Sequence, residues 1–590
     1  MLALGAACAG LCWCYARLSA TFPAGSDGAS SALEGWDLLH GNWLLRGWTL
    51  TDVSFYTTEL PEYAAIELAR GLNPGVLRIA AAVTYTLLVV VSALLAGGRR
   101  SDTGDCGTGH RDTGSRDTGS WGAEGWARAL IAAAILLAPQ LGDGVHVLLA
   151  QPDHTGTQVL ILGIFVVLER APRRWYTVGA VWALLTAGIV ADKIVIVDAV
   201  VPLTFVALLH AQWTRRPLAH RFELSLAVAA PAAAATAGLL LTLISRAGGF
   251  TMLPVQTGLT TPGSVPGHLS LAWHGVLSLF GSDVTAAAPG PQTALALLHA
   301  PGIALAVAAF AATAWRVPNQ RDLVGDVLAV GIVVNLGGFV ASVIPATAFD
   351  TREVSALLPF GAVLAGRVFG RRARVPALRR GSATKGAADE AADEAADGRF
   401  QWPGRARAWV PAVAFVIAGA CQLAALGYGA AQPAAADPER ALAAWLAAHQ
   451  LTSGLGTFNE DNLTTLDSDG RVRLLTVSWQ PPAPAARRSF QPDRQAGQAA
   501  QAPPRGGAVA RLYQSSASWY DAGDHYADFV VTGTADGTAD VIPRREILAL
   551  AGPPARTYQF QSFTIMVWDT NLLAQLGGPP SRLPGVIGRP

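Results

Sequence analysis

The sequence predicts a polytopic α-helical membrane protein of about eleven transmembrane helices, with a small extracytoplasmic α+β domain at its C-terminus. Composition is the first reason, because 51% of the 590 residues are hydrophobic and only 14% are charged, against about 25% charged in soluble domains. The second is a series of apolar runs close to the roughly 20 residues that cross a bilayer. The third is the loss of such runs after residue 428.

The membrane domain is expected over residues 1–428. Its apolar runs predict spans near 1–18, 76–97, 127–141, 156–169, 175–191, 194–211, 224–244, 292–315, 323–344, 353–369 and 408–428. The first run lacks a basic leader and a small-residue cleavage site, so we interpret it as a span and not as a cleaved signal peptide.

Arginines indicate the orientation, because they gather in alternate loops: Arg99, Arg173, Arg215, Arg316 and the stretch from Arg371 to Arg407. Basic loops stay on the cytoplasmic side. The loops 21–75, 142–155 and 245–291 and the domain 429–590 are then outside, and we expect a multi-pass protein of the plasma membrane. The segments 98–126 and 371–407 repeat Arg-Asp-Thr-Gly and Ala-Ala-Asp-Glu units, which predicts disordered cytoplasmic linkers.

The C-terminal domain alternates helical and strand patterns. "PERALAAWLAAHQL" and "PRREILALAG" are expected to be helices, "RVRLLTVSW" and "ADFVVTG" strands, and "TYQFQSFTIMVWD" a strand pair. The motif "GLGTFNEDNLTTLDSDG" fits a solvated loop or, less often, a sugar-binding patch. The five cysteines show no spacing typical of a disulfide framework or a zinc site.

Acidic and aromatic residues gather in the first outer loop, in "TDVSFYTTELPEYAAIE". A carboxylate at a membrane surface can act as a general base or bind a divalent cation, although a single acid often only faces water. Glu59 lies between aromatic residues and a proline, so we favour it as the base, with Asp52 as the second candidate. Glu62 and Glu67 are expected to be solvated.

Two more outer segments carry candidate site residues. In "QPDHTGTQ", Asp153 and His154 fit a metal site or an acid–base pair, and Asp153 also fits a simple helix cap. In "FDTREV", Arg352 is one of few basic residues outside the membrane, and arginine suits phosphate. Its alternative roles are snorkelling or pairing with Glu353.

These features resemble the GT-C superfamily of membrane glycosyltransferases, which includes protein O-mannosyltransferases and the aminoarabinose transferase of lipid A. "GNWLLRGWTLTDVSFYTTELPEY", "PDHTGT", "TREVSALLPFGAVLAGR" and "LAAWLAAHQLTSGLG" also look like a set of multi-span proteins from high-GC bacteria. The chain departs from many GT-C enzymes in one respect. Their first loop carries two adjacent acids, whereas Asp52 and Glu59 are separated in sequence.

The resemblance implies transfer of a hexose or pentose from a polyprenyl-phosphate donor to an extracytoplasmic glycan, lipid or protein. It gives Glu59 or Asp52 the role of base, and makes Asp153 and His154 a second acidic element or metal site. Arg352 would neutralise the departing phosphate. A divalent cation, Mg²⁺ or Mn²⁺, is the one cofactor it allows. The partners expected are the lipid-linked sugar and membrane lipids, and no nucleic acid.

The 245–291 loop adds two substrate-loop candidates, His268 and His274, because it is long enough to cover an acceptor. Two other classes stay open. A transporter would use charges inside spans, for which Asp192 and Lys193 are the only candidates, although we interpret them as an ion pair. A non-catalytic scaffold would bind a cell-wall partner through its outer domain.

Overall fold

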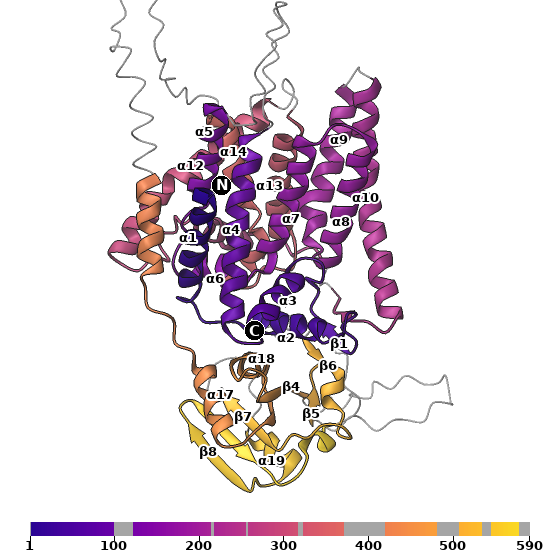
Figure 1. The fold of residues 1–590 in the computed structure, drawn as a ribbon, viewed down its shortest axis with the longest axis vertical. Helices are drawn as coiled ribbons and strands as arrows, with labels where there is room; N and C mark the ends of the chain where they lie inside the picture. Colours follow the sequence, from indigo (N-terminus) through magenta and orange to yellow (C-terminus); the bar gives the residue numbers. More distant parts are fainter. Residues whose placement is uncertain are drawn as a thin grey trace, which may run out of the picture.

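The computed structural model describes residues 2–98, 122–213, 217–254, 258–316, 322–370, 419–480, 507–533 and 544–576. In this part the chain forms a helical bundle, a layer of short elements at one end of the bundle, and a C-terminal α+β unit beyond that layer (Figure 1). The expected linkers 98–126 and 371–407 lie almost wholly outside the described residues.

Six helices within the described ranges are long and apolar enough to cross a membrane. They are α1 (Leu2–Ser19), α4 (Gly75–Gly97), Ile196–Trp213 (η1, Ile196–Val200, continued by α9, Val201–Trp213), α10 (Pro217–Arg246), α12 (Pro291–Arg316) and α13 (Leu323–Ala341). A polytopic helical architecture therefore agrees with the prediction, but the count of about eleven spans does not.

The count differs because several apolar runs form helices that are short for a bilayer. These are α5 (Ala123–Leu136), α8 (Trp175–Ala191) and α14 (Leu357–Phe369), and α7 (Asp153–Arg170) has charged residues at both ends. Almost every side chain of α14 is buried, as expected of a core helix and not of a lipid-facing span. The run at 408–428 is described only from residue 419.

The layer at the end of the bundle is built from segments expected to lie outside. Its elements are α2 (Ser26–Leu39), β1 (Trp48–Leu50), α3 (Glu59–Arg70), α6 (Asp143–Leu149), β2 (Thr251–Met252), α11 (Val265–Leu279) and the 3₁₀ helix η2 (Ala348–Val354). The stretches 21–75 and 245–291 are thus folded over much of their length and are not open loops. Close packing of α2 on α3 depends on Gly35, where a Cβ would lie 2.9 Å from the Cβ of Tyr63.

The C-terminal unit contains a six-stranded mixed sheet in the order β5-β4-β3-β7-β9-β8. Its elements are α17 (Pro438–Ala448), β3 (Ser453–Gly456), α18 (Phe458–Asp467), β4 (Arg473–Gln480), β5 (Gly507–Ala510), β6 (Ser515–Ser516), η4 (Ala517–Tyr520), β7 (Phe529–Gly533), α19 (Arg544–Ala551), β8 (Arg556–Phe560), β9 (Phe563–Val567) and η5 (Leu572–Gln575). The predicted helices and strands of this region are confirmed as α17, β4, β7, α19 and the pair β8–β9.

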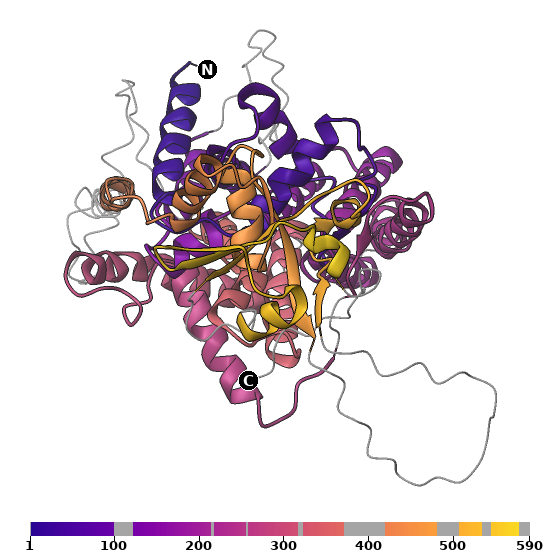
Figure 2. The same ribbon diagram turned by 90° about the horizontal axis from the view of Figure 1, so that it is seen from below.

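The C-terminal unit packs directly on the layer, over the end of the bundle (Figure 2). Strand β6 pairs with β1, and the Ala517 N–H donates to the carbonyl of Gly47 at 2.8 Å. Helix α18 packs on α2, and Asn462 donates to the Ser30 hydroxyl at 2.6 Å. The prediction of a solvated loop for "GLGTFNEDNLTTLDSDG" is therefore wrong, because this motif forms β3 and α18 and buries Asn462 at the junction.

Candidate functional site

Arg352 lies at the centre of the candidate site. It belongs to η2, which begins with a capping box formed by Thr347 and Asp350. Its Nη1 atom pairs with Asp153 at 3.0 Å and with Asp27 at 3.5 Å, and its guanidinium lies 4.0 Å from the ring centre of Phe349. Burial alone would lower the pKa of Arg352, but the carboxylates of Asp153 and Asp27 raise it above its usual range. Arg352 is therefore a permanent cation.

One edge of this guanidinium is unused. The Nε–H of Arg352 is buried, and no described residue accepts a hydrogen bond from it. Both ion pairs are made by Nη1 alone. An arginine binds phosphate or carboxylate best through two parallel N–H groups, so the Nε side is the part of Arg352 that fits an incoming anion.

Two cavities meet at Arg352. The larger has a volume of about 210 Å³ and is lined by Phe22, Pro23, Ala24, Gly25, Asp27, His146, Val147, Ala150, Gln151, Asp153, Phe349 and Arg352. The smaller has a volume of about 30 Å³ and is lined by Asp27, Gly28, Ser31, Thr51, Asp52, Val53, Phe55, Glu59, Tyr63, Gln151, Asp153, Arg352, Tyr513 and Gln514. Arg352, its two carboxylate partners and Gln151 belong to both walls, so a ligand in either cavity would reach the arginine.

Four residues singled out from the sequence converge on the smaller cavity, namely Asp52, Glu59, Asp153 and Arg352. They come from three separate segments that the sequence predicts to lie outside. The first segment is held in place by the end of α8, because the N–H groups of Ser54 and Phe55 both donate to the carbonyl of Ala191, at 2.8 and 2.9 Å. These two hydrogen bonds hold Ser54 and Phe55 in place, and Asp52 and Glu59 lie on either side of them in the sequence.

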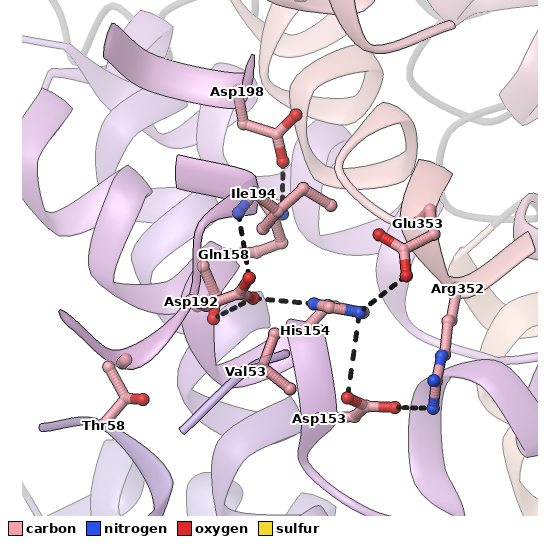
Figure 3. Close-up of polar contacts among 12 residues, drawn as sticks. Val53, Thr58, Asp153, His154, Gln158, Asp192, Ile194, Asp198, Arg352 and Glu353 are labelled. Atoms are coloured by element: carbon pink, nitrogen blue, oxygen red, sulfur yellow. Dashed lines mark hydrogen bonds and ion pairs between the residues drawn. The ribbon is translucent and has the colours of Figure 1, made fainter. Parts of the chain in front are cut away.

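His154 lies behind this cavity and is not in its wall. Its Nδ1 is 2.7 Å from Asp192 and its Nε2 is 3.2 Å from Glu353 (Figure 3). Burial lowers the pKa of His154, but Glu353, Asp192 and Asp153 together raise it well above its usual value. A charged His154 thus bridges two carboxylates, and Asp192 pairs with His154 where an ion pair with Lys193 was expected.

The other two predicted histidines do not belong to this site. His268 and His274 both lie on α11, and neither lines the two cavities. The Nδ1 of His268 is 3.1 Å from the carbonyl of Val340, and the Nδ1 of His274 is 3.1 Å from Asp283. Their segment forms a helix against η2, so we keep neither residue as a substrate contact.

The two candidate bases have opposite surroundings. Glu59 is 1% exposed and packs against α7 at Gly156, where a Cβ would overlap its carboxylate. Burial raises the pKa of Glu59 well above its usual value, against the lowering effect of the hydrogen bond from Thr58. This shift favours the neutral, protonated form of Glu59. Asp52 is exposed at the rim of the smaller cavity and forms no ion pair with a described residue, and desolvation together with Glu353 raises its pKa less strongly.

The expectation that Glu62 and Glu67 face water is wrong for Glu67 and only partly met for Glu62. Glu67 is 1% exposed because α3 packs tightly on α2, and neither carboxylate oxygen has a hydrogen-bond partner among the described residues. Glu62 is half-buried, and the Thr84 hydroxyl donates to it at 2.6 Å. Burial raises the pKa of Glu67 to about 9 and that of Glu62 to about 7.

The buried state of Glu67 predicts a pH-dependent stability. Because its pKa rises from 4.5 to about 9 on folding, the folded state loses stability as the pH rises through this interval, by at most about 1.4 kcal/mol per pH unit. Gln stays neutral, so we expect Glu67→Gln to melt close to wild type at pH 5 and above it at pH 8. Thermal unfolding of detergent-purified protein measures this, with the exposed Asp569→Asn as control. A difference from wild type that is constant across pH would contradict the assignment.

A chain of polar side chains continues from this site into the bundle (Figure 3). Asp198 is fully buried in the span Ile196–Trp213, where Gln158 and Asn335 donate to its two oxygens at 2.8 and 2.7 Å. Asn335 also donates to the carbonyl of Glu353 at 2.9 Å. Asp198 forms no ion pair within the described part of the chain, and it lies in the π-helical turn η1, a conformation frequent at functional sites.

Sequence reasoning missed several of these residues. Asp198 could have been predicted from the sequence, because a lone acidic residue inside an apolar span is a functional candidate by default. Nothing in the sequence distinguishes the other missed residues, because each is an ordinary polar residue that only the fold brings to the cavity wall. These are Asp27, Gln151, Tyr513 and Gln514.

A metal site made only of protein side chains is not formed in the described residues, where no group of three or more His, Cys, Asp or Glu side chains is close enough to hold an ion. Mg²⁺ commonly binds through one or two carboxylates and the phosphates of a substrate. Asp52 at the rim and Asp27, whose buried Oδ1 has no partner among the described residues, fit that arrangement.

Comparison with protein-family models and with curated proteins yields no match to this chain. The geometry of the site therefore carries the functional argument.

Proposed function

We propose that this protein is a membrane glycosyltransferase of the GT-C type, which moves a sugar from a polyprenyl-phosphate donor to an acceptor outside the cytoplasm. The observation that carries the proposal is the position of Arg352. It is a partly exposed cation whose buried Nε–H has no partner among the described residues, and it lies where two cavities meet, next to carboxylates of different exposure. A phosphate-leaving reaction needs such a cation beside a carboxylate that can take a proton.

In this mechanism the acceptor hydroxyl oxygen attacks the anomeric carbon of the donor sugar. The bond from that carbon to the phosphate oxygen breaks, and its electron pair leaves with the polyprenyl phosphate. Arg352 binds the negative charge that develops on the phosphate, through Nε and the rest of its free edge. The proton of the acceptor hydroxyl passes to a carboxylate in the smaller cavity.

Asp52 suits the role of base better than Glu59, although the sequence favoured Glu59. A general base must be ionised at the working pH. Burial raises the pKa of Glu59 well above its usual value, which favours its protonated form. Desolvation and the nearby Glu353 also raise the pKa of Asp52, but less strongly. Asp52 is exposed and unpaired in the described part of the chain, and it lines the same cavity. We assign Glu59 the role of a neutral group in the cavity wall.

A divalent cation is compatible with this site. Asp27, whose Oδ1 has no partner among the described residues, is the carboxylate that would hold Mg²⁺ or Mn²⁺ together with the donor phosphate, and Asp52 would stay free as the base. When bound, the cation would neutralise phosphate charge in the same way as Arg352.

Asp198 favours one rival function, a transporter coupled to protons or cations. A carboxylate with no cationic partner in the described residues, buried inside a span, is typical of proton and ion pathways. The two functions predict different results for Asp198→Asn. A transporter would lose substrate movement across proteoliposomes, whereas the transferase would keep its chemistry at Arg352.

The test of the proposed function is release of polyprenyl phosphate by the purified protein. Polyprenyl-phosphate mannose and polyprenyl-phosphate arabinose serve as hexose and pentose donors, and nucleotide sugars serve as controls. We expect turnover of a lipid-linked donor and none of the nucleotide sugars. Turnover of nucleotide sugars alone would contradict the proposal.

The proposal also requires the C-terminal unit to be outside the cytoplasm, because strand β6 of that unit pairs with β1 beside the site. The arginine asymmetry of the loops supports this orientation, because basic loops stay on the cytoplasmic side. Protease added to intact spheroplasts should therefore remove residues 429–590, while a cytoplasmic marker protein stays intact. Complete protection of this unit would place the site on the wrong side for a lipid-linked donor.

A further inference from the structure

We infer that the C-terminal unit supplies an acceptor-binding residue, Gln514, whose side-chain amide hydrogen-bonds a hydroxyl group of a sugar acceptor in the smaller cavity. This inference rests on the proposed function and extends it. It gives the outer domain a direct part in the reaction and names the acceptor class as a hydroxyl-bearing glycoside.

The first observation is the state of the Gln514 side chain. It is 6% exposed and lines the smaller cavity, yet its amide makes no hydrogen bond with another residue in the described part of the chain. The Oε1 atom is fully shielded and without a partner there. Buried amides are almost always hydrogen-bonded in folded proteins, so a buried amide that lines a cavity and has no partner among the described residues indicates a ligand.

The second observation is that the fold holds Gln514 at this place against its backbone preference. Its φ is 48°, in the left-handed region that residues other than glycine seldom adopt. The Asn462 amide donates to its carbonyl at 3.3 Å and to Ser30 of α2 at 2.6 Å. Next to it, Ser515 and Ser516 pair with β1. The segment is therefore fastened to the layer that carries the first outer acids.

The third observation concerns the size of the cavity and its other polar groups. A volume of about 30 Å³ admits a group as small as one hydroxyl, whereas the cavity of about 210 Å³ on the other side of Arg352 has room for a larger moiety. Asp52 and Gln514 line the same small space. A hydroxyl there can donate its proton toward Asp52 while its oxygen accepts from the Gln514 side-chain N–H₂. Rotation of the amide by 180° exchanges its nitrogen and oxygen, so the position without a partner can hold this donor.

The chain offers a matched control for a test of this role. Gln561, in the turn between β8 and β9, has the same side chain and nearly the same backbone conformation, with φ of 50°. It is exposed and does not line either cavity. Comparing Gln514→Leu with Gln561→Leu therefore separates the loss of a ligand contact from the strain of leucine at a left-handed position.

The experiment measures transfer from polyprenyl-phosphate mannose or arabinose to a panel of octyl hexosides and octyl pentosides. We expect Gln514→Leu to raise the KM for the glycoside by about three- to tenfold, the size of one lost neutral hydrogen bond, with the donor KM unchanged. Gln561→Leu should match wild type in both. Thermal unfolding of the two variants checks that each is folded.

Each outcome decides between the inference and the function on which it rests. A wild-type protein that releases no polyprenyl phosphate overturns the proposed function. If the wild type is active but Gln514→Leu has the wild-type glycoside KM, Gln514 is not an acceptor contact while the transferase stands. Release of polyprenyl phosphate without transfer to any glycoside overturns the acceptor class.

Discussion

Arg352→Gln should lower the turnover of a polyprenyl-phosphate sugar by about 10²- to 10³-fold in kcat, the range seen when one preorganised donor to a developing charge is removed. The reason is geometric. Nη1 of Arg352 is held by Asp153 and Asp27, which fixes the guanidinium and leaves its Nε–H without a partner among the described residues, free for the anion that we propose. Arg352→Lys keeps the charge but not the planar pair of donors, so we expect only partial recovery.

This substitution also leaves the buried Asp153 and the partly exposed Asp27 without their cation. Breaking a fully buried pair costs about 3–5 kcal/mol, and the partial exposure of Arg352 and Asp27 makes the cost smaller here. The double variant Arg352→Gln/Asp153→Asn removes the closer pair as a whole and should regain part of that stability. It should not regain turnover. Arg471→Gln is the control, because Arg471 is exposed on the C-terminal unit. Wild-type turnover in the double variant would mean that Arg352 only neutralises its neighbours.

Asp52→Asn should lower kcat by about 10²- to 10⁴-fold, the usual contribution of a general base, whereas Glu59→Gln should change kcat little near pH 7. The contrast follows from burial. Glu59 is 1% exposed and holds a proton, and a carboxamide has nearly the same shape as a protonated carboxyl. Asp52 is exposed at the rim and can exchange its proton with solvent.

The two variants form a matched pair, since both replace a carboxyl with an amide at the same cavity. Initial rates at saturating donor, with thermal unfolding as the folding check, give the comparison. A large loss in Glu59→Gln and none in Asp52→Asn would restore the assignment that the sequence favoured. Equal small losses in both would remove the first outer segment from the chemistry.

Local sequence patterns predicted much of the fold correctly, but they did not predict the number of membrane spans. The helical period of "PERALAAWLAAHQL" and the alternation in "TYQFQSFTIMVWD" correctly predicted α17 and the β8–β9 pair. Hydropathy cannot separate a short span from a buried core helix, and α14 is such a helix, enclosed by neighbours on all sides. The folded layer was not predicted, because helices α2 and α3 are amphipathic and their composition resembles that of polar loops.

Four charged residues that were predicted from the sequence as site residues line one cavity. They are Asp52, Glu59, Asp153 and Arg352. Their types were informative because charged side chains are costly close to the hydrocarbon of a membrane without a role. Their protonation was not predictable, since it depends on tertiary burial: Glu59 and Glu67 look like ordinary surface acids until α7 and α2 cover them. Gln514 reaches the cavity only through the pairing of β6 with β1.

A structure of the protein in complex with polyprenyl phosphate, the expected leaving group, would show whether Arg352 binds the phosphate. We expect the phosphate to lie within hydrogen-bonding distance, about 3 Å, of Nε of Arg352, at the junction of the two cavities. A phosphate bound outside both cavities, with Nε of Arg352 still without a partner, would contradict the proposed role of Arg352.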